Sequence, residues 1–397
     1  MLESKPRVRV RPRILIASIA LILVIGSMAF WSLRGRAPGS MAPSPAEHTG
    51  PQPTSVRLPS PPPIEEKPFS TVTVFYATDR KLTKDASPNR RYGSDQNGSL
   101  TYGSAEVSIP RDHHMGQIES PSWLRFEFRP DPEKHVILVG VSPIPGAPEF
   151  SRRLSAHLNT RPAKELLVFV HGFNVDFSEA IKRTAQITYD LGFPGVPITY
   201  TWASLSKLSL TAYKEDGRTA DATAPRLREF LTLLSKKTGA ERIHVIAHSM
   251  GNRVLTQALE GITVDPAAAG PLLSEVMLTA PDVDEEVMRA LALRFVRTAE
   301  RFTLYASERD SALTVAQKYT KKRRAGQGGS GILVVPRIDS IEASKVDTDL
   351  VGHSYYGDNR SVLSDMFYVL RTRRRPPDRF GMLERQRGRD VFWEFAP

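Results

Sequence analysis

The spacing of apolar residues divides the chain into an N-terminal part that resembles strands and a longer part in which strands and helices alternate. Three strand-like segments come first, with turn-forming Asn, Asp, Gly and Pro between them, and they cover 71–80, 100–110 and 124–144. A short helix is predicted over 149–158. Together these segments predict a mostly β-structured beginning.

Beyond residue 160, apolar runs that suit buried strands alternate with amphipathic helical patterns. The predicted strands are 165–170, 196–202, 242–247, 275–280, 301–306 and 331–336, and the predicted helices are 177–190, 222–238, 251–260, 285–298 and 361–371. Such an order predicts an α/β fold with a mostly parallel central sheet and helices on both faces. Active sites in such sheets form at the carboxyl ends of the strands.

The N-terminus has a different pattern, because residues 14–33 carry no charge over 20 positions, the length of a membrane-spanning helix. Five basic residues precede this run and only Arg34 and Arg36 follow closely, so the positive-inside rule places residues 1–13 in the cytoplasm. A cleaved signal peptide is the alternative, with residues 27–29 as the cleavage site. Both patterns predict that the bulk of the chain is exported.

Composition sets the remaining boundaries and excludes several classes of function. Residues 34–68 are rich in proline and predict an extended tether, followed by a globular domain over 69–370 and a basic tail over 371–397. Residues 1–37 and the tail carry most of the net charge of +11, which removes the main argument for nucleic-acid binding by the domain. The absence of cysteine excludes disulfides, thiol catalysis and Cys-based zinc sites.

The candidate nucleophile is Ser249, in the stretch AHSMG. It directly follows the strand 242–247 and opens the helix 251–260, which is the strand-turn-helix setting of a nucleophile elbow. That turn requires small residues two positions before and two positions after the serine, and Ala247 and Gly251 satisfy it. The alternative is an ordinary helix-capping serine.

A serine hydroxyl needs a base and an orienting acid, which follow the nucleophile in the order acid, then histidine. His353 is the only histidine after Ser249 in the sequence and is therefore the candidate base. The candidate acid is Asp310, which follows the strand 301–306, with Asp282 as the alternative. The strand 165–170 runs into a His-Gly turn, so the amides of Phe173 and Met250 are expected to bind the oxyanion.

Seven stretches of the sequence carry a family resemblance: VFYATDRK, YGSAEVSIPRDH, HGFN, TWAS, AHSMG, LYASERD and GHSYY. Taken together, they resemble a bacterial alpha/beta-hydrolase family of unknown function grouped with esterases and lipases. The resemblance covers about 69–370 and implies the triad Ser249, Asp310 and His353. Ala203 departs from the proline that family members often have after the tryptophan. The resemblance implies the fold and the triad rather than a substrate.

Four other side chains are possible pocket residues: His171, Trp202, Tyr213 and Asp216. His171 alternatively braces the oxyanion loop, and Tyr213 and Asp216 alternatively pin their loop to the body. The basic run 318–327 is expected to be a solvated surface or, alternatively, to attract anionic substrates. The glycine-rich stretch 326–331 leads into a predicted strand and opens no helix, so we predict a loop there and no nucleotide site.

These observations predict a membrane-tethered serine hydrolase with its catalytic domain in the periplasm, or a periplasmic or secreted protein if the N-terminal segment is cleaved. The expected substrate is a small-molecule or lipid-like ester or thioester, no cofactor or metal is required, and no nucleic acid is expected as a partner. Only one helix is predicted between the strands 275–280 and 301–306, which leaves room for a small lid at most. The alternative function is a non-catalytic binding or scaffold module that keeps the same fold.

Overall fold

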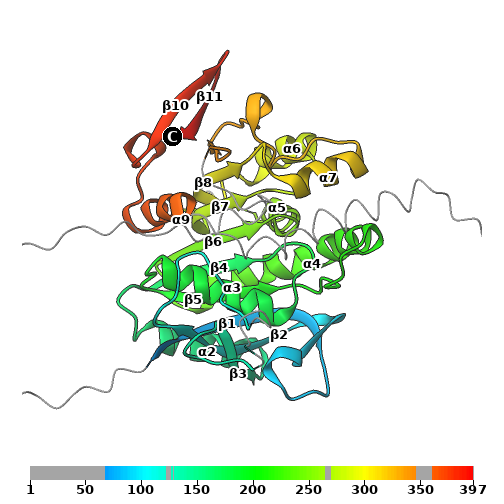
Figure 1. The fold of residues 1–397 in the computed structure, drawn as a ribbon, viewed down its shortest axis with the longest axis vertical. Coiled ribbons are helices and arrows are strands. Elements are labelled where there is room, and N and C mark those ends of the chain that lie inside the picture. Colours follow the sequence, from blue (N-terminus) through cyan, green and yellow to red (C-terminus); the bar gives the residue numbers. More distant parts are fainter. Residues whose placement is uncertain (1–67, 122–126, 128, 264–269, 346–359, 397) are drawn as a thin grey trace, which may run out of the picture.

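The architecture is an eleven-stranded, mostly parallel sheet between two layers of helices, as the computed structural model of residues 68–121, 127, 129–263, 270–345 and 360–396 shows (Figure 1). The strand order is β10-β11-β9-β8-β7-β6-β4-β5-β1-β2-β3. The parallel centre consists of β1 (Phe69–Leu82), β4 (Glu165–Val170), β5 (Val196–Thr201), β6 (Arg242–His248), β7 (Leu273–Thr279), β8 (Ala299–Ala306) and β9 (Ile338–Glu342). The predicted α/β fold with a mostly parallel sheet is confirmed.

Antiparallel strands extend the sheet at both ends. β2 (Tyr92–Pro110) pairs with β1 and with β3 (Ile137–Ile144), both antiparallel. At the opposite end, β10 (Met382–Arg387) and β11 (Asp390–Phe395) form a hairpin whose second strand lies parallel to β9. The segment 371–397, which we predicted as a basic tail, therefore contributes two strands to the sheet.

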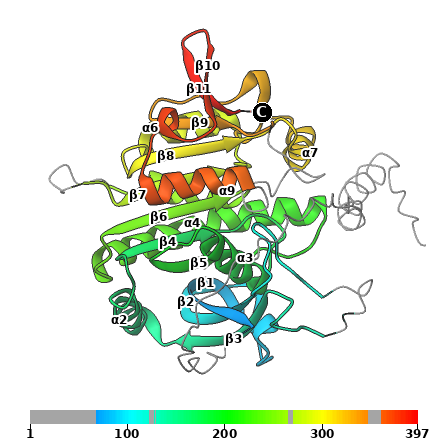
Figure 2. The ribbon, with the colours of Figure 1, turned by 60° about the vertical axis from the view of Figure 1, so that its left-hand side comes forward.

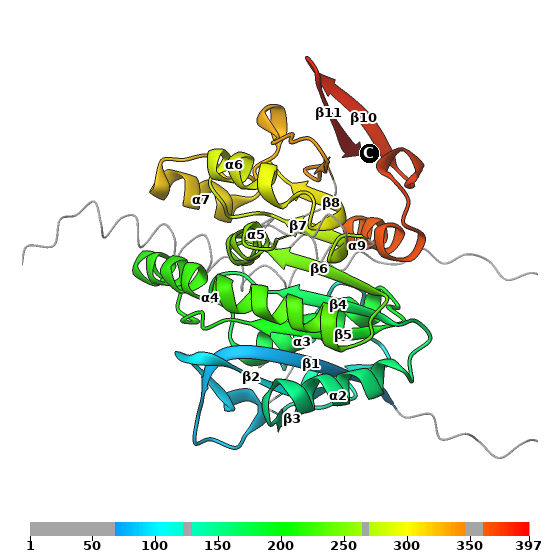
Figure 3. The same ribbon diagram turned by 180° about the vertical axis from the view of Figure 1, so that it is seen from behind.

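The helices divide between the two faces of the sheet. The larger core lies between one face and α2 (Gly146–Leu158), α4 (Leu210–Lys237), α5 (Gly251–Glu260) and α6 (Glu285–Phe295). Apolar side chains of α3 (Phe177–Asp190) and α9 (Arg360–Phe367) cover the other face (Figures 2 and 3). α3 begins at a capping box, in which the Asp176 carboxylate accepts from the Glu179 amide and the Glu179 carboxylate accepts from the Asp176 amide.

Two predicted segments, 331–336 and 222–238, differ from the structure, and one helix was not predicted. The predicted strand 331–336 is wrong: a 3-10 turn, Gly329–Gly331, leads into an irregular stretch whose Ile332, Leu333 and Val335 are buried in the larger core, and the strand is β9. Burial rather than strand pairing explains that apolar run. α4 begins at Leu210, twelve residues before the predicted start, because the Ser209 hydroxyl caps it by accepting from the Ala212 amide. α7 (Ser311–Thr320) had no predicted counterpart.

The remaining turns are short. They comprise 3-10 turns at Pro88–Arg90 and Pro376–Asp378 and a π-helical turn, Tyr368–Thr372, that continues α9. No helix within the described ranges combines the length and the apolar character that crossing a bilayer demands. The predicted membrane segment 14–33 and the predicted tether 34–68 lie outside those ranges.

Candidate functional site

Ser249 occupies a strained turn between β6 and α5. Its φ is +52°, a left-handed conformation that side-chain-bearing residues rarely adopt. The Ser249 amide donates to the Thr279 carbonyl of the neighbouring strand at 3.0 Å, and the Asp282 amide donates to the Ser249 carbonyl at 3.1 Å. The conformation is thus held in place by the end of β7.

Two glycines allow the chain after β4 to approach this turn. A Cβ built on Gly172 would lie 2.8 Å from the Ser249 Cβ, and one built on Gly251 would lie 2.5 Å from the carbonyl oxygens of Val170 and His171. Both distances are far below ordinary contact. The turn that bears Ser249 and the His-Gly turn after β4 therefore touch directly, and only glycine fits at the two points of contact.

Ala247 stands where this turn often has glycine, and the structure accommodates its methyl group in the larger core. The carbonyl of Ala247 accepts from the Asn252 side-chain amide at 3.0 Å and from the Thr279 hydroxyl at 2.9 Å. Asn252 also donates to the carbonyls of Ser249 and Thr279. A single buried amide thus joins both sides of the turn.

His171 braces the loop that follows β4. Its ring stacks on the indole of Trp202 at 5.2 Å, its Nδ1 donates to the Gly172 carbonyl at 2.9 Å, and its Nε2 accepts from the Trp202 amide at 3.1 Å. Burial, and secondarily the Arg80 charge, lower the pKa of His171 to about 3. A neutral ring with both nitrogens engaged is suited to holding the loop rather than to transferring protons.

Arg80, a residue that the sequence analysis did not single out, joins four parts of the chain beneath this loop. Its fully buried guanidinium donates to the Thr201 hydroxyl at 2.9 Å and to three carbonyls, those of Val175 at 2.6 Å, Gly93 at 3.1 Å and Ser204 at 3.1 Å. Burial lowers the pKa of Arg80 to about 10, which leaves the group charged at neutral pH. In the sequence, the charged pair Asp79-Arg80 at the end of an apolar strand could have indicated this role.

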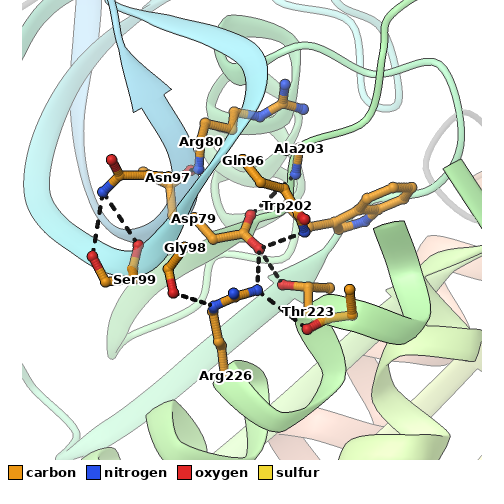
Figure 4. Close-up of polar contacts among 12 residues, drawn as sticks. Asp79, Arg80, Gln96, Asn97, Gly98, Ser99, Trp202, Ala203, Thr223 and Arg226 are labelled. Atoms are coloured by element: carbon orange, nitrogen blue, oxygen red, sulfur yellow. Dashed lines mark hydrogen bonds and ion pairs between the residues drawn. The ribbon is translucent and has the colours of Figure 1, made fainter. Parts of the chain in front are cut away.

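Asp79 makes a second buried network on the other side of β1 (Figure 4). Its carboxylate accepts from the Ala203 amide at 3.1 Å, from the Thr223 hydroxyl at 2.7 Å and from Arg226 at 3.3 Å. Arg226 also donates to the Gly98 carbonyl, so the network ties α4 to β2. Ala203 places its amide, rather than a proline ring without a donor, against this carboxylate.

Trp202 and Asp216 support the site from within the core. Trp202 is fully buried and donates from its indole nitrogen to the His171 carbonyl at 2.8 Å. The Asp216 carboxylate accepts from the Ser204 hydroxyl at 2.6 Å and from the Leu205 amide at 2.9 Å, and burial raises the pKa of Asp216. Asp216 therefore pins the loop after β5 to α4, the second of the two roles considered for it.

Tyr213 lies between the loop that follows β4 and Asp282. Its ring packs edge-on against Phe173 with centroids 5.6 Å apart, and its hydroxyl donates to Asp282 Oδ2 at 2.8 Å. Arg324 donates to the other carboxylate oxygen of Asp282 at 2.7 Å. Both oxygens of Asp282 are therefore already engaged, in a buried ion pair that fixes Tyr213.

Asp310 lies at the end of the turn after β8 and caps α7. The side chain is buried, and its Oδ1 accepts from the Leu313 amide at 2.9 Å. The candidate base, His353, lies outside the described residues. Asp310 thus stands at the carboxyl edge of the sheet, the same edge as Ser249.

Basic side chains of the run 318–327 form more ion pairs with acidic side chains than the sequence suggested. Arg324 is buried against Asp282, Arg323 lies 3.0 Å from the Glu285 carboxylate, and Lys322 lies 3.1 Å from that of Asp284. The run therefore holds the loop after α7 onto the start of α6.

A cavity of about 340 Å³ opens beside the loop that follows β4. Its lining includes Gly172, Phe173 and His248 from the two contacting turns, and Lys182 and Arg183 from α3. Of the four possible pocket residues, His171 lines this cavity.

Comparison with known proteins places this arrangement in a wider group. A family model described as an alpha/beta hydrolase of unknown function (DUF900) matches residues 147–373, which is more than half of the chain. No protein with a curated description is significantly similar to the sequence.

Proposed function

Because the chain belongs to this alpha/beta-hydrolase family of unknown function, we propose that it is a serine hydrolase that cleaves carboxylic esters or thioesters through an acyl-enzyme. The single observation that carries the proposal is the positive φ of Ser249 at a turn into which two glycines are packed. Such strain persists only where the surrounding structure enforces it, and it is typical of functional positions.

In the proposed reaction, Ser249 Oγ attacks the acyl carbon while His353 takes the hydroxyl proton. The amides of Phe173 and Met250 stabilise the oxyanion, and His353 then gives the proton to the departing alcohol or thiol. Water, deprotonated by the same histidine, releases the acid and restores Ser249. Apart from the substrate and water, these proposed steps use only side chains and amides of this chain.

The surroundings of the two candidate acids favour Asp310 as the partner of His353. Arg324 and Tyr213 occupy both oxygens of Asp282, whose role we propose to be structural. Asp310 follows β8, the position from which the acid of this fold commonly acts, and its burial keeps water from competing with a histidine.

The substrate is proposed to be a small-molecule or lipid-like ester. α6 is the helix between β7 and β8, which agrees with a small lid and a cleft open to solvent. The cell envelope is the proposed location, with residues 14–33 as an inner-membrane anchor and the domain in the periplasm, or with the domain released if that segment is cleaved.

A fluorophosphonate probe tests the proposal, because it reacts with activated serines. The intact chain should be labelled at Ser249, and Ser249→Ala should abolish labelling while Ser235→Ala, a matched change on α4, leaves it intact. His353→Ala should also abolish labelling, because the hydroxyl then keeps its proton. Absence of labelling in the intact chain, or equal labelling of Ser249→Ala, would favour the non-catalytic scaffold instead.

A further inference from the structure

The two most exposed large apolar side chains of the described residues lie near the same edge of the sheet. Phe380 is 83% exposed and Leu293 is 76% exposed. Leu293 is in the last turn of α6, just before β8 begins, and Phe380 follows Arg379, whose guanidinium lies 3.7 Å from the carboxylate of Asp339 at the start of β9. They therefore flank the amino ends of β8 and β9 from the two faces of the sheet.

Leu293 is part of a shallow groove of about 220 Å³. Its apolar lining includes Val296 and Pro336, and two arginines, Arg297 and Arg337, complete it. On the other face, Phe380 comes after the run Arg373–Arg375, and Arg374 is exposed. Each apolar group is thus accompanied by guanidinium groups, the composition that suits a boundary between lipid head groups and acyl chains.

Three arginines at this edge form no ion pair within the described part of the chain. Arg297, Arg337 and Arg371 are exposed and make no hydrogen bond or ion pair with any residue that the structure describes. Of the acidic groups near this edge, Glu300 pairs with Arg373 and Asp339 with Arg379, and the exposed Asp378 is outnumbered by the three unpaired arginines. The edge therefore presents an unbalanced positive charge.

The same edge carries the connection to the N-terminal segment. β1 is parallel to β5 and hence to β4, β6, β7, β8 and β9, so Phe69 lies at the amino-end edge. Figures 1 and 3 both show the start of β1 and the red chain between α9 and β10 on one side of the sheet. The first described residues of the domain therefore lie on the side of the sheet that carries Phe380.

We propose that this amino-end edge, with Leu293 and Phe380 as apolar contacts and Arg297, Arg337 and Arg371 as cationic contacts, rests on an anionic lipid bilayer. The carboxyl edge, with Ser249, then faces away from the membrane. The inference concerns orientation and does not depend on hydrolysis. Lipid is the proposed partner because apolar and cationic groups occur together on both faces of the sheet at the amino ends of β8 and β9, on the same edge at which β1 begins.

The absence of cysteine makes a direct test possible, since a single introduced thiol can be spin-labelled in the full chain. Leu293→Cys and Phe380→Cys report on the proposed surface. Leu82→Cys is the matched control, because Leu82 is exposed at the opposite end of the 14-residue strand β1, roughly 40 Å from Phe69. The three proteins are reconstituted in lipid nanodiscs of phosphatidylcholine with or without one-third phosphatidylglycerol.

In the anionic nanodiscs, the labels at 293 and 380 should collide with oxygen dissolved in the bilayer and be protected from an aqueous nickel chelate, whereas the label at 82 should remain open to the chelate. If 293 and 380 are as accessible to the chelate as 82, the proposal is overturned. Equal protection in phosphatidylcholine alone would overturn its electrostatic basis. No turnover is measured, so the outcome is independent of Ser249.

Charge reversal completes the test. Each arginine near an anionic surface favours docking about five-fold, so loss of the three charges alone lowers the ratio of docked to undocked protein about a hundred-fold. The reversal Arg297→Glu/Arg337→Glu/Arg371→Glu should lower this ratio by more than that. The matched variant Lys81→Glu/Lys84→Glu/Lys207→Glu changes the net charge equally at the carboxyl edge and should leave docking nearly unchanged. An equal loss in both variants would contradict the assigned surface, and circular dichroism checks that both are folded.

Discussion

Arg80 Nη2 donates to the Val175 carbonyl at 2.6 Å and thereby fixes the loop that follows β4 to the end of β1. The rest of the guanidinium bonds to Thr201, Gly93 and Ser204, so one side chain sets the relative positions of β1, β2 and the loops after β4 and β5. No carboxylate is among these hydrogen-bond partners. We therefore regard Arg80 as a positioning residue of the proposed oxyanion site.

Replacing Arg80 by methionine should both destabilise the domain and impair catalysis. Four acceptors lose their donor, and those on Thr201 and Ser204 are fully buried, so the free energy of unfolding should fall by about 3 kcal/mol or more. The proposed oxyanion donor should shift, so kcat for a chromogenic ester is expected to fall at least ten-fold with a smaller change in KM. Urea unfolding and steady-state kinetics separate the two effects, and an unchanged kcat in folded Arg80→Met would contradict the positioning role.

Gly172→Ala should displace the proposed nucleophile, Ser249, from the proposed oxyanion site in the loop after β4. The added methyl would lie 2.8 Å from the Ser249 Cβ and 3.1 Å from the His248 carbonyl, so one of the two turns must move. Because shifts of this size are costly at a reacting centre, we expect about a hundred-fold loss of kcat/KM. Gly140→Ala, on β3, meets nothing within 4 Å and should leave kinetics unchanged. Equal activity of both variants would refute the close contact.

Asparagine substitutions should distinguish the two candidate acids. Asp310→Asn is expected to reduce kcat roughly 10³- to 10⁴-fold with little change in stability, because it removes the charge that orients and stabilises the histidine. Asp282→Asn leaves the Arg324 guanidinium buried without its counter-ion, so it should lower the free energy of unfolding by about 3 kcal/mol. Thermal unfolding and single-turnover rates on both variants decide the assignment, and the reverse pattern would make Asp282 the acid.

Because of His113, the domain is expected to lose stability at alkaline pH. Burial alone would lower its pKa, but hydrogen bonds to Asp190 and Glu119, each 2.9 Å long, outweigh burial and raise the pKa to about 9. Because the folded pKa lies above the unfolded value, this contribution is complete below about pH 6.5 and is lost as the pH rises through 9. The difference in unfolding free energy between the wild type and His113→Gln should therefore shrink between pH 7 and 10. A constant difference over that interval would show that the histidine is neutral throughout.

The hydrophobic pattern of the sequence was sufficient to predict the parallel centre of the sheet. Continuous apolar runs such as 165–170 and 242–247 have one stable placement, in a sheet covered on both faces, and they were found where predicted. The same apolar criterion failed at 331–336, because an irregular segment can bury Ile332 and Leu333 equally well. It also missed β10 and β11, whose strands are short, charged and half exposed.

By itself, the sequence determined the order of the candidate residues: a serine between a strand and a helix, an acid after a later strand, and a single downstream histidine. Local rules sufficed there, since the turn at Ser249 depends on small neighbours that are adjacent in the chain. Only the tertiary structure shows the partners of Asp282, His171 and Arg80, which lie on other strands and loops. The function of a buried polar group is set by the groups that satisfy it, and these are distant in sequence.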